Sequence, residues 1–187
     1  MTHHTDSRTV AILAADGFEQ VELTSPRDRL QETGVKTQIV SLKGGTIQAN
    51  KHREHGDTFE VDVTLEKAKA SDYDALLIPG GLFSPDALRT QPKAQSFVKA
   101  FFEAKKPVFA ICHGPQVLIS AGVVRGRSMT AVKAVQKDLE HAGAKVSDEA
   151  VVVDAGLVTS RTPDDLDQFN ARIVSELARA ETASQSR

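Results

Sequence analysis

Short runs of apolar residues, each followed by a helical pattern, constrain the fold of this chain more than any other feature. Three of them are almost uninterrupted: Thr9–Ala14, Ala75–Pro79 and Pro107–Ile111. Runs of this length without polar alternation are typical of strands that are buried on both faces, as in a parallel sheet. A further strand is predicted over Lys36–Leu42. The chain is therefore predicted to form a sheet that helices cover on both sides.

Helical patterns fill the intervals between these runs, and helices are expected over Glu19–Thr33, Pro92–Lys105, Pro115–Ala121, Val132–Ala142 and Asp164–Ala180. The alternation of strands and helices predicts a doubly wound, mostly parallel α/β sandwich. Ligands of such folds bind beyond the carboxyl ends of the strands. The segments that directly follow the strands are therefore the first place to look for chemistry.

Two segments depart from this alternation. Val151–Asp154 and Leu157–Ser160 are predicted to form a β-hairpin, because the Ala-Gly pair between them is a tight-turn signal. Residues 44–63 are polar and contain several glycines, so we expect a small excursion or an extra hairpin. His52 and His55 lie in this stretch without enough further ligands for a metal site, and we expect them on the solvated surface.

The composition excludes several classes of protein. The chain has 187 residues, and 23 Lys plus Arg against 25 Asp plus Glu give a net charge of −2. A near-neutral chain lacks the basic field of most nucleic-acid-binding proteins. It contains neither a P-loop nor a G-x-G-x-x-G motif, and no apolar run approaches the roughly 18 residues that span a bilayer. No nucleic-acid, nucleotide or membrane partner is therefore expected.

A single cysteine, Cys112, limits the chain further. It excludes an intrachain disulfide and a zinc site built on cysteine pairs, and it fits a reducing compartment. The first residues are polar and lack the apolar core of a signal peptide, so a cytoplasmic location is expected. We expect one domain over residues 9–179, with loosely ordered ends at residues 1–8 and 180–187. No cofactor and no metal are expected.

Cys112 lies in a sequence layout that suits a nucleophile. The segment Ala110–Gly114 follows a predicted buried strand and precedes a helical stretch, as the nucleophile elbow G-x-S-x-G does. A thiol there lies at a helix N-terminus, where free N–H groups and the helix dipole lower the pKa of the thiol. The alternative is an inert, buried cysteine that acts as a small hydrophobe. The strand–turn–helix layout favours the reactive thiolate.

Further candidate groups are expected at the same rim of the sheet. His113 is either a general base or a side chain turned outward with only its backbone N–H in the site. Gly80 and Gly81 end another apolar strand, and they either present N–H groups to a negative oxygen or form a plain turn. Glu19 is either an ordinary first-turn acid of a helix or a protonated carboxyl that donates a hydrogen bond to the sulfur, since two neighbouring anions are costly.

These motifs resemble those of the PfpI/ThiJ superfamily, specifically its branch of PfpI-type intracellular cysteine proteases and general stress proteins, which is deglycase-like. The similarity extends in order over nearly the whole chain, through Asp16–Leu23, Leu77–Gly81, Pro107–Gln116, Leu118–Gly126 and Val151–Leu166. The superfamily also contains class I glutamine amidotransferases, which carry a His-x-Glu pair late in the chain. The corresponding residues 160–165 contain no histidine, so an amidotransferase is not expected.

The resemblance implies a flavodoxin-like α/β sandwich with a catalytic Cys112. It implies that Glu19 hydrogen-bonds the sulfur and that His113 acts as the base. In oligomeric members an acid from the neighbouring subunit orients this histidine, and Asp86 is the candidate here. The oxyanion hole would be formed at Gly80-Gly81, by Gly81 together with the backbone N–H of His113. A homo-oligomer, a dimer or a larger assembly, is expected on the same ground.

The function that the resemblance implies is a cysteine-dependent hydrolase. Its substrate would be a small molecule or a peptide: either a peptide bond, or a glyoxal or methylglyoxal adduct of a protein or nucleobase, as in deglycases and glyoxalases. The alternative is a non-enzymatic sensor of oxidative stress, in which the same cysteine is oxidised to a sulfenic or sulfinic acid. A chaperone is a third option.

Overall fold

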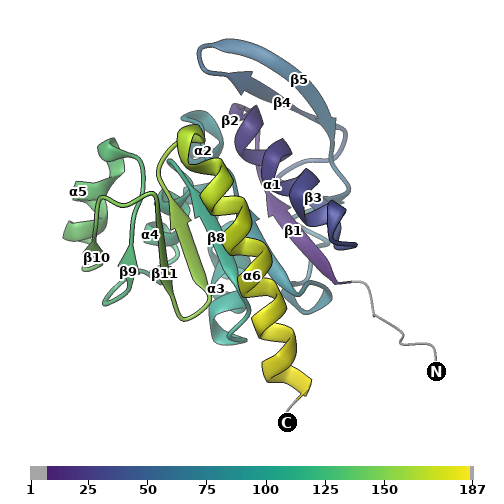
Figure 1. The fold of residues 1–187 in the computed structure, drawn as a ribbon. Helices are drawn as coiled ribbons and strands as arrows, with labels where there is room; N and C mark the ends of the chain where they lie inside the picture. Colours follow the sequence, from purple (N-terminus) through teal and green to yellow (C-terminus); the bar gives the residue numbers. More distant parts are fainter. Residues whose placement is uncertain (1–7, 186–187) are drawn as a thin grey trace.

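The computed structural model describes residues 8–185, with side chains described as far as residue 180 (Figure 1). Its centre is a seven-stranded sheet with the strands in the order β11 (Val151–Asp154), β12 (Leu157–Ser160), β8 (Val108–Ile111), β7 (Ala75–Ile78), β1 (Thr9–Leu13), β3 (Lys36–Ser41) and β6 (Val63–Thr64). All neighbours pair in parallel except β11 and β12, which form an antiparallel hairpin. The predicted doubly wound, mostly parallel α/β sandwich is therefore confirmed.

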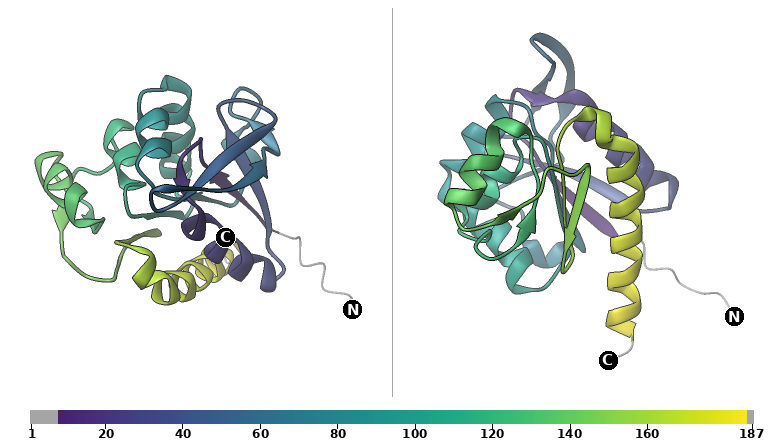
Figure 2. Two further views of the ribbon diagram at one scale, coloured as in Figure 1. Left: turned by 90° about the horizontal axis from the view of Figure 1, so that it is seen from above. Right: turned by 60° about the vertical axis from the view of Figure 1, so that its left-hand side comes forward.

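Helices cover both faces of this sheet. One face carries α1 (Gln20–Glu32) and α6 (Leu166–Gln185), and the other carries α2 (Phe83–Arg89), α3 (Pro92–Glu103), α4 (Pro115–Ser120) and, further out, α5 (Lys133–His141). Seen from above, the purple α1 and the yellow α6 lie together on one side and the teal helices on the other (Figure 2). Two short 3₁₀ turns, Ala70–Asp72 and Pro163–Asp165, complete the helical elements of the described chain.

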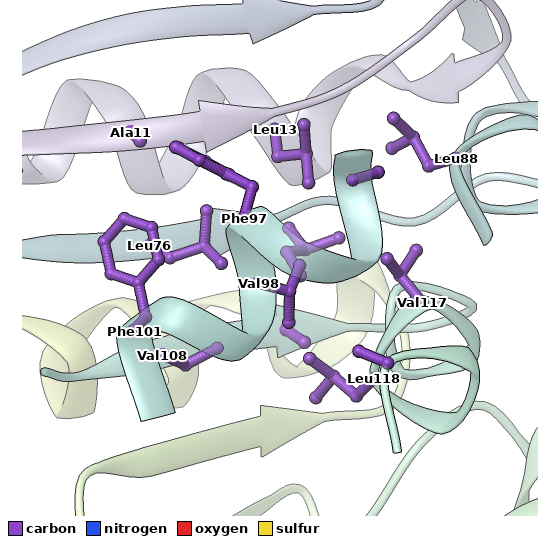
Figure 3. Packing of buried hydrophobic residues seen from close by; sticks show 14 of the residues in the cluster. Ala11, Leu13, Leu76, Leu88, Phe97, Val98, Phe101, Val108, Val117 and Leu118 are labelled. Carbon is purple, nitrogen blue, oxygen red and sulfur yellow. The ribbon is translucent and has the colours of Figure 1, made fainter. Parts of the chain in front are cut away.

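The central strands are buried on both faces because their alternate residues enter two different cores. In β1, Ala11 and Leu13 pack on the side of α3, whereas Val10 and Ile12 pack on the side of α1 and α6. This is the period of two that a strand imposes on its side chains. The core under α3 and α4 is shown in Figure 3 and includes Leu76, Leu88, Phe97, Val98, Phe101, Val108, Val117 and Leu118.

Residues 44–63 form the extra hairpin that was one of the two expectations for this stretch. It consists of β4 (Thr46–Lys51) and β5 (Glu54–Glu60), and β4 pairs in parallel with the short β2 (Phe18–Glu19). The phenyl ring of Phe18 meets that of Phe59 edge-on, with ring centroids 5.5 Å apart. In Figure 1 the hairpin extends above β2 and α1, at the end of the sheet where β1 finishes.

Several element boundaries differ from the predicted ones. The C-terminal helix α6 continues to Gln185, so much of the predicted loose tail 180–187 is helical, while residues 186 and 187 lie outside the described part. Of the predicted loose segment 1–8, only Arg8 is described, and its guanidinium donates a hydrogen bond to the carbonyl of Leu177. A small parallel pair of strands, β9 (Ser128–Met129) and β10 (Lys145–Val146), was not predicted. Within residues 8–185, no helix is long and apolar enough to span a membrane.

The two-sided burial of the central strands predicts that two Phe→Ala substitutions differ strongly in their effect on the free energy of unfolding. Phe109 in β8 is fully buried between the sheet and its helices, whereas Phe83 is 65% exposed. We expect Phe109→Ala to lower the free energy of unfolding by about 3–5 kcal/mol, because it opens a cavity. We expect Phe83→Ala to change it by less than about 0.5 kcal/mol. Urea unfolding followed by circular dichroism measures both values, and equal losses would contradict the two-sided burial of β8.

Candidate active site

A pocket of about 400 Å³ lies at the carboxyl ends of the parallel strands. Because β1, β7, β8 and β12 run in the same direction, the segments that follow them meet at one edge of the sheet. The pocket is lined by the segment after β1, the loop after β7, the turn after β8, Pro163 after β12, and the turn of the β4–β5 hairpin.

Cys112 forms the turn between β8 and α4. Its φ angle is +61°, in the left-handed region that residues other than glycine rarely adopt. Hydrogen bonds hold this conformation: the N–H of Cys112 donates to the carbonyl of Ser160 (3.1 Å), and its carbonyl accepts from the N–H of Val132 (3.2 Å). The N–H of Gly114 closes the turn onto the carbonyl of Ile111 (2.9 Å). The side chain is therefore directed out of the sheet edge by a fixed, strained backbone.

The sulfur of Cys112 lies at the floor of the pocket among polar groups. The residue is 9% exposed, so it is covered but accessible from the pocket. Sγ lies 3.3 Å from Nδ1 of His113. The backbone N–H groups of Gly81 and His113 donate hydrogen bonds to the sulfur. Two amide donors and one imidazole nitrogen therefore surround the atom that we expect to react.

The carboxyl next to the sulfur belongs to Glu22 and not to Glu19, which corrects the assignment made from sequence. Glu22 is fully buried in the first turn of α1; its carboxyl interacts with the Cys112 thiol, and its Oε2 accepts a hydrogen bond from the N–H of Gly80 (2.8 Å). Glu19 precedes the helix with an extended backbone, and its carboxylate accepts from the N–H of His52 (3.0 Å). The position before the helix directs Glu19 toward the hairpin.

Burial makes Glu22 an unusually weak acid. Desolvation raises the pKa of its carboxyl to about 8, with a smaller contribution from the charge of Glu19, while the bonds to Gly80 and Cys112 act in the opposite direction. The other carboxyl oxygen, Oε1, is buried and accepts no hydrogen bond from any described protein group. A protonated carboxyl fits this environment, because its O–H is a donor and its charge is absent.

Burial also raises the pKa of the Cys112 thiol, and an ionised Glu22 raises it further. This is opposite to the lowered pKa that the helix N-terminus predicts from sequence. The N–H groups of Gly81 and His113 lower it, but they do not offset the loss of water. Since each charge opposes the other, the pair carries at most one negative charge near neutral pH. The thiolate is therefore favoured only while Glu22 keeps its proton.

The two glycines of the loop after β7 have different roles. Gly81 has a φ of +89° and its N–H points to the sulfur, as the oxyanion-hole assignment requires of a donor. The N–H of Gly80 is bound to Glu22, so Gly80 is not a donor to a substrate, and this part of the assignment is wrong. A Cβ at Gly80 would lie 2.7 Å from Cβ of Cys112, so the absence of a side chain there allows Glu22 and Cys112 to meet.

The imidazole of His113 is half-buried, and this burial lowers its pKa. It is therefore neutral at pH 7 and has a free lone pair for a proton. His113 faces the sulfur, so the alternative of an outward-turned side chain is wrong. Asp86 is exposed in the first turn of α2, and within residues 8–180 no hydrogen bond joins it to His113. Its expected role, from a neighbouring subunit, stays a prediction.

Six residues that line the pocket were not predicted as site residues from the sequence: Glu22, Asn50, Arg53, Leu82, Phe83 and Pro163. His52 and His55 are both exposed, as expected, and His52 also lines the pocket. A signal for Glu22 exists. It lies four residues before Pro26 and next to Leu23, both on the buried face of α1, and a carboxyl in an apolar stripe indicates a special environment.

Comparison with known proteins places this geometry in context. The model of the DJ-1/PfpI family matches residues 8–176. An uncharacterized protein of Staphylococcus haemolyticus strain JCSC1435 is 50% identical over 173 residues, which cover 91% of this chain and 98% of that protein. An uncharacterized protein of Staphylococcus aureus strain MRSA252 is 49% identical over 173 residues, with 91% and 99% covered.

Solved structures give the same result. A protein of Anabaena variabilis with a DJ-1/ThiJ/PfpI-like and a ferritin-like domain is similar with a TM-score of 0.87 and 38% identity over 92% of this chain. The match covers 48% of that protein, so the chain spans about half its length. A ThiJ/PfpI domain protein of Brachyspira murdochii gives a TM-score of 0.84 at 23% identity, covering 92% and 96% of the two chains, and shows the shared flavodoxin-like fold.

The buried acid predicts a pH dependence of stability. A carboxyl whose pKa rises from 4.5 to about 8 on folding is protonated in the native state while the unfolded chain ionises. Stability is therefore highest below pH 4.5 for this group and falls by about 1.4 kcal/mol per pH unit between the two values. Glu22→Gln keeps an acceptor for Gly80 and removes the titration.

We therefore expect the melting temperature of the wild type to fall relative to that of Glu22→Gln as the pH rises from 5 to 8. Differential scanning calorimetry of both proteins across this range measures the difference. Glu19→Gln is the control, because that carboxylate accepts hydrogen bonds at the exposed rim. Parallel curves for the wild type and Glu22→Gln would show that Glu22 is ionised in the folded protein.

Proposed function

Because the chain belongs to the DJ-1/PfpI family, we propose that it is a hydrolase whose nucleophile is Cys112, acting on small carbonyl compounds and carbonyl adducts. The observation that carries this proposal is the arrangement at the sulfur. A strained backbone holds Sγ at the floor of a pocket, with a neutral acid on one side and an imidazole on the other. A merely structural cysteine requires none of these groups.

The thiolate forms by transfer of the thiol proton to Nδ1 of His113, 3.3 Å away. The products are a thiolate and an imidazolium, so the buried pocket gains no net charge, which limits the desolvation cost that opposes ionisation of the thiol alone. Glu22 assists by keeping its own proton. It then removes the repulsion that an ionised carboxylate would exert on the thiolate, and the O–H of the protonated carboxyl is a donor that the sulfur can accept from.

The thiolate then attacks the carbonyl carbon of the substrate. As the S–C bond forms, the charge moves from sulfur to the carbonyl oxygen, and the N–H groups of Gly81 and His113 no longer have an anionic sulfur to bind. These N–H groups are then available to the new oxyanion, which is two bonds from the sulfur, and donors at that position lower the barrier. An aldehyde gives a hemithioacetal at this stage. In an adduct or amide, His113 returns its proton to the leaving amine, and water completes the hydrolysis.

The dimensions of the pocket favour small substrates over peptides. A volume of about 400 Å³ holds a small molecule or one modified side chain. Leu82 and Phe83 at its rim are 63% and 65% exposed and provide apolar contact for the remainder of a substrate. Among the alternatives raised by the sequence, a deglycase or glyoxalase type of reaction therefore fits better than cleavage of an extended polypeptide.

The proposal predicts that Cys112→Ala abolishes turnover. We expect a loss of at least about 1000-fold in kcat/KM, because the nucleophile is removed. The substrate panel comprises methylglyoxal, a methylglyoxal-modified peptide and an unstructured protein. Circular dichroism checks that the variant is folded, and Cys112→Ser tests whether a hydroxyl at the same elbow retains partial activity.

Full activity of Cys112→Ala would overturn the assignment of the nucleophile. If the wild type turns over none of these substrates, mass spectrometry after peroxide treatment tests the sensor alternative. Conversion of Cys112 to a sulfenic or sulfinic acid at low peroxide would then favour the sensor.

A further inference from the structure

The turn of the β4–β5 hairpin is fixed at the rim of the pocket. His52 at this turn has a left-handed φ of +58°, and its N–H donates to both carboxylate oxygens of Glu19, at 3.3 and 3.0 Å. The two-residue strand β2, which contains Glu19, pairs in parallel with β4. The carboxylate that was expected at the sulfur therefore positions the hairpin turn.

Two further contacts fix the body of the hairpin to the same segment. The side chain of Asp16 accepts a hydrogen bond from the N–H of Gln48 at 2.8 Å. The side-chain amide of Gln20 makes two hydrogen bonds with Asp57, donating to its carboxylate at 2.6 Å and accepting from its N–H at 2.8 Å. With anchors at three points along its length, the hairpin forms a rigid wall, and its side chains are held in place relative to Cys112.

Arg53 follows His52 on this wall and lines the pocket. It is the only lysine or arginine among the lining residues, and no ion pair or hydrogen bond joins it to another residue of the described chain. An arginine that is exposed to a pocket without a carboxylate partner is available to an anion from outside. Its planar guanidinium binds a carboxylate through two parallel hydrogen bonds.

The acids of the pocket do not neutralise this guanidinium. Glu22 is protonated near neutral pH, as its raised pKa indicates. The carboxyl oxygens of Glu19 both accept a hydrogen bond from the N–H of His52. The remaining lining residues include the neutral His113 and the exposed Leu82. The pocket therefore combines one unpaired cation with a nucleophile and an apolar rim.

We propose that Arg53 is a specificity-determining residue that binds a carboxylate of the substrate, so that the preferred substrates are small carbonyl compounds that also carry a carboxylate. The proposal rests on the proposed function and specifies its substrate class. In the reaction, Sγ adds to the carbonyl carbon while the guanidinium holds the carboxylate, and the carbonyl oxygen receives the proton from His113. The carboxylate is unchanged in this step.

Alkylation of Cys112 tests the anion site without requiring turnover. Iodoacetate and iodoacetamide have nearly the same shape, but only the first carries a carboxylate. In each case Sγ displaces iodide and forms one S–C bond, and Cys112 is the only thiol of the chain. Intact-protein mass spectrometry gives the two rate constants and their ratio, iodoacetate over iodoacetamide. Because both reagents consume the same thiolate, the ratio is independent of the pKa of the thiol.

We expect Arg53→Gln to lower this ratio by about fivefold, as the loss of one exposed charged contact predicts. Arg53→Lys should give an intermediate ratio, because it keeps the charge and loses the planar pair of donors. The matched control is Lys51→Gln, which removes one positive charge from the same hairpin at a residue that pairs with Asp57 (3.9 Å) and does not line the pocket. Its ratio should equal that of the wild type.

An unchanged ratio in Arg53→Gln would overturn the proposal. So would a fall in Lys51→Gln as large as that in Arg53→Gln, because the effect would then come from the total positive charge of the hairpin and not from a contact with Arg53. A protection measurement then addresses the carbonyl compound itself. Succinic semialdehyde and butanal, an anionic and a neutral aldehyde, each form a reversible hemithioacetal with Sγ and so slow the alkylation of Cys112 by iodoacetamide, and we expect Arg53→Gln to weaken this protection for the first only. If neither aldehyde protects Cys112, the proposed addition of the thiolate to carbonyl compounds fails, while the alkylation ratio still decides whether Arg53 binds carboxylates.

Discussion

The carboxyl of Glu22, which accepts a hydrogen bond from the N–H of Gly80, is the group at which the three segments of the site meet. This hydrogen bond connects the end of β7 to the first turn of α1, and the same carboxyl meets the thiol that follows β8. The contact requires the parallel order of the central strands, because only then do the ends of β1, β7 and β8 lie at one edge. It also requires a glycine at position 80, where a Cβ would collide with both partners.

This contact sets the electrostatics of the pocket. Two acids that are buried side by side cannot both be charged, so the environment decides which of them holds the proton. Burial raises the pKa of both groups, the N–H of Gly80 lowers that of Glu22, and the N–H groups of Gly81 and His113 lower that of the thiol. Near neutral pH both groups therefore keep their protons, and in the proposed mechanism the thiol ionises only by passing its proton to His113. In the proposed mechanism the cysteine thus ionises in a largely dehydrated position, and Arg53 is the only lysine or arginine that lines the same pocket.

Much of this arrangement could be predicted from the sequence, because the signals are local. The apolar runs of β1, β7 and β8 and the small residues around Cys112 indicate the sheet and the elbow directly. The sequence does not distinguish Glu19 from Glu22 as the acid at the sulfur, because both are near the end of β1 and only the position at which the helix begins separates them. Glu19 is the last residue of the strand β2 and precedes α1, whereas Glu22 turns inward with Leu23. Strand β2 has two residues and pairs with a distant hairpin, so no local pattern indicates it.

Because of the hairpin, the proposed reacting groups and the proposed substrate-binding arginine lie on different elements of the chain. The groups that we propose to react belong to the ends of the central strands, where each residue is packed against several others and substitution disturbs the core. Arg53 belongs to a turn outside the seven-stranded sheet, attached through side chains of the segment after β1. A change at this turn alters the surface that meets the substrate and leaves the buried layers intact. Divergence among relatives can therefore exchange one ligand for another by single replacements at an exposed tip, with the same sulfur chemistry beneath it.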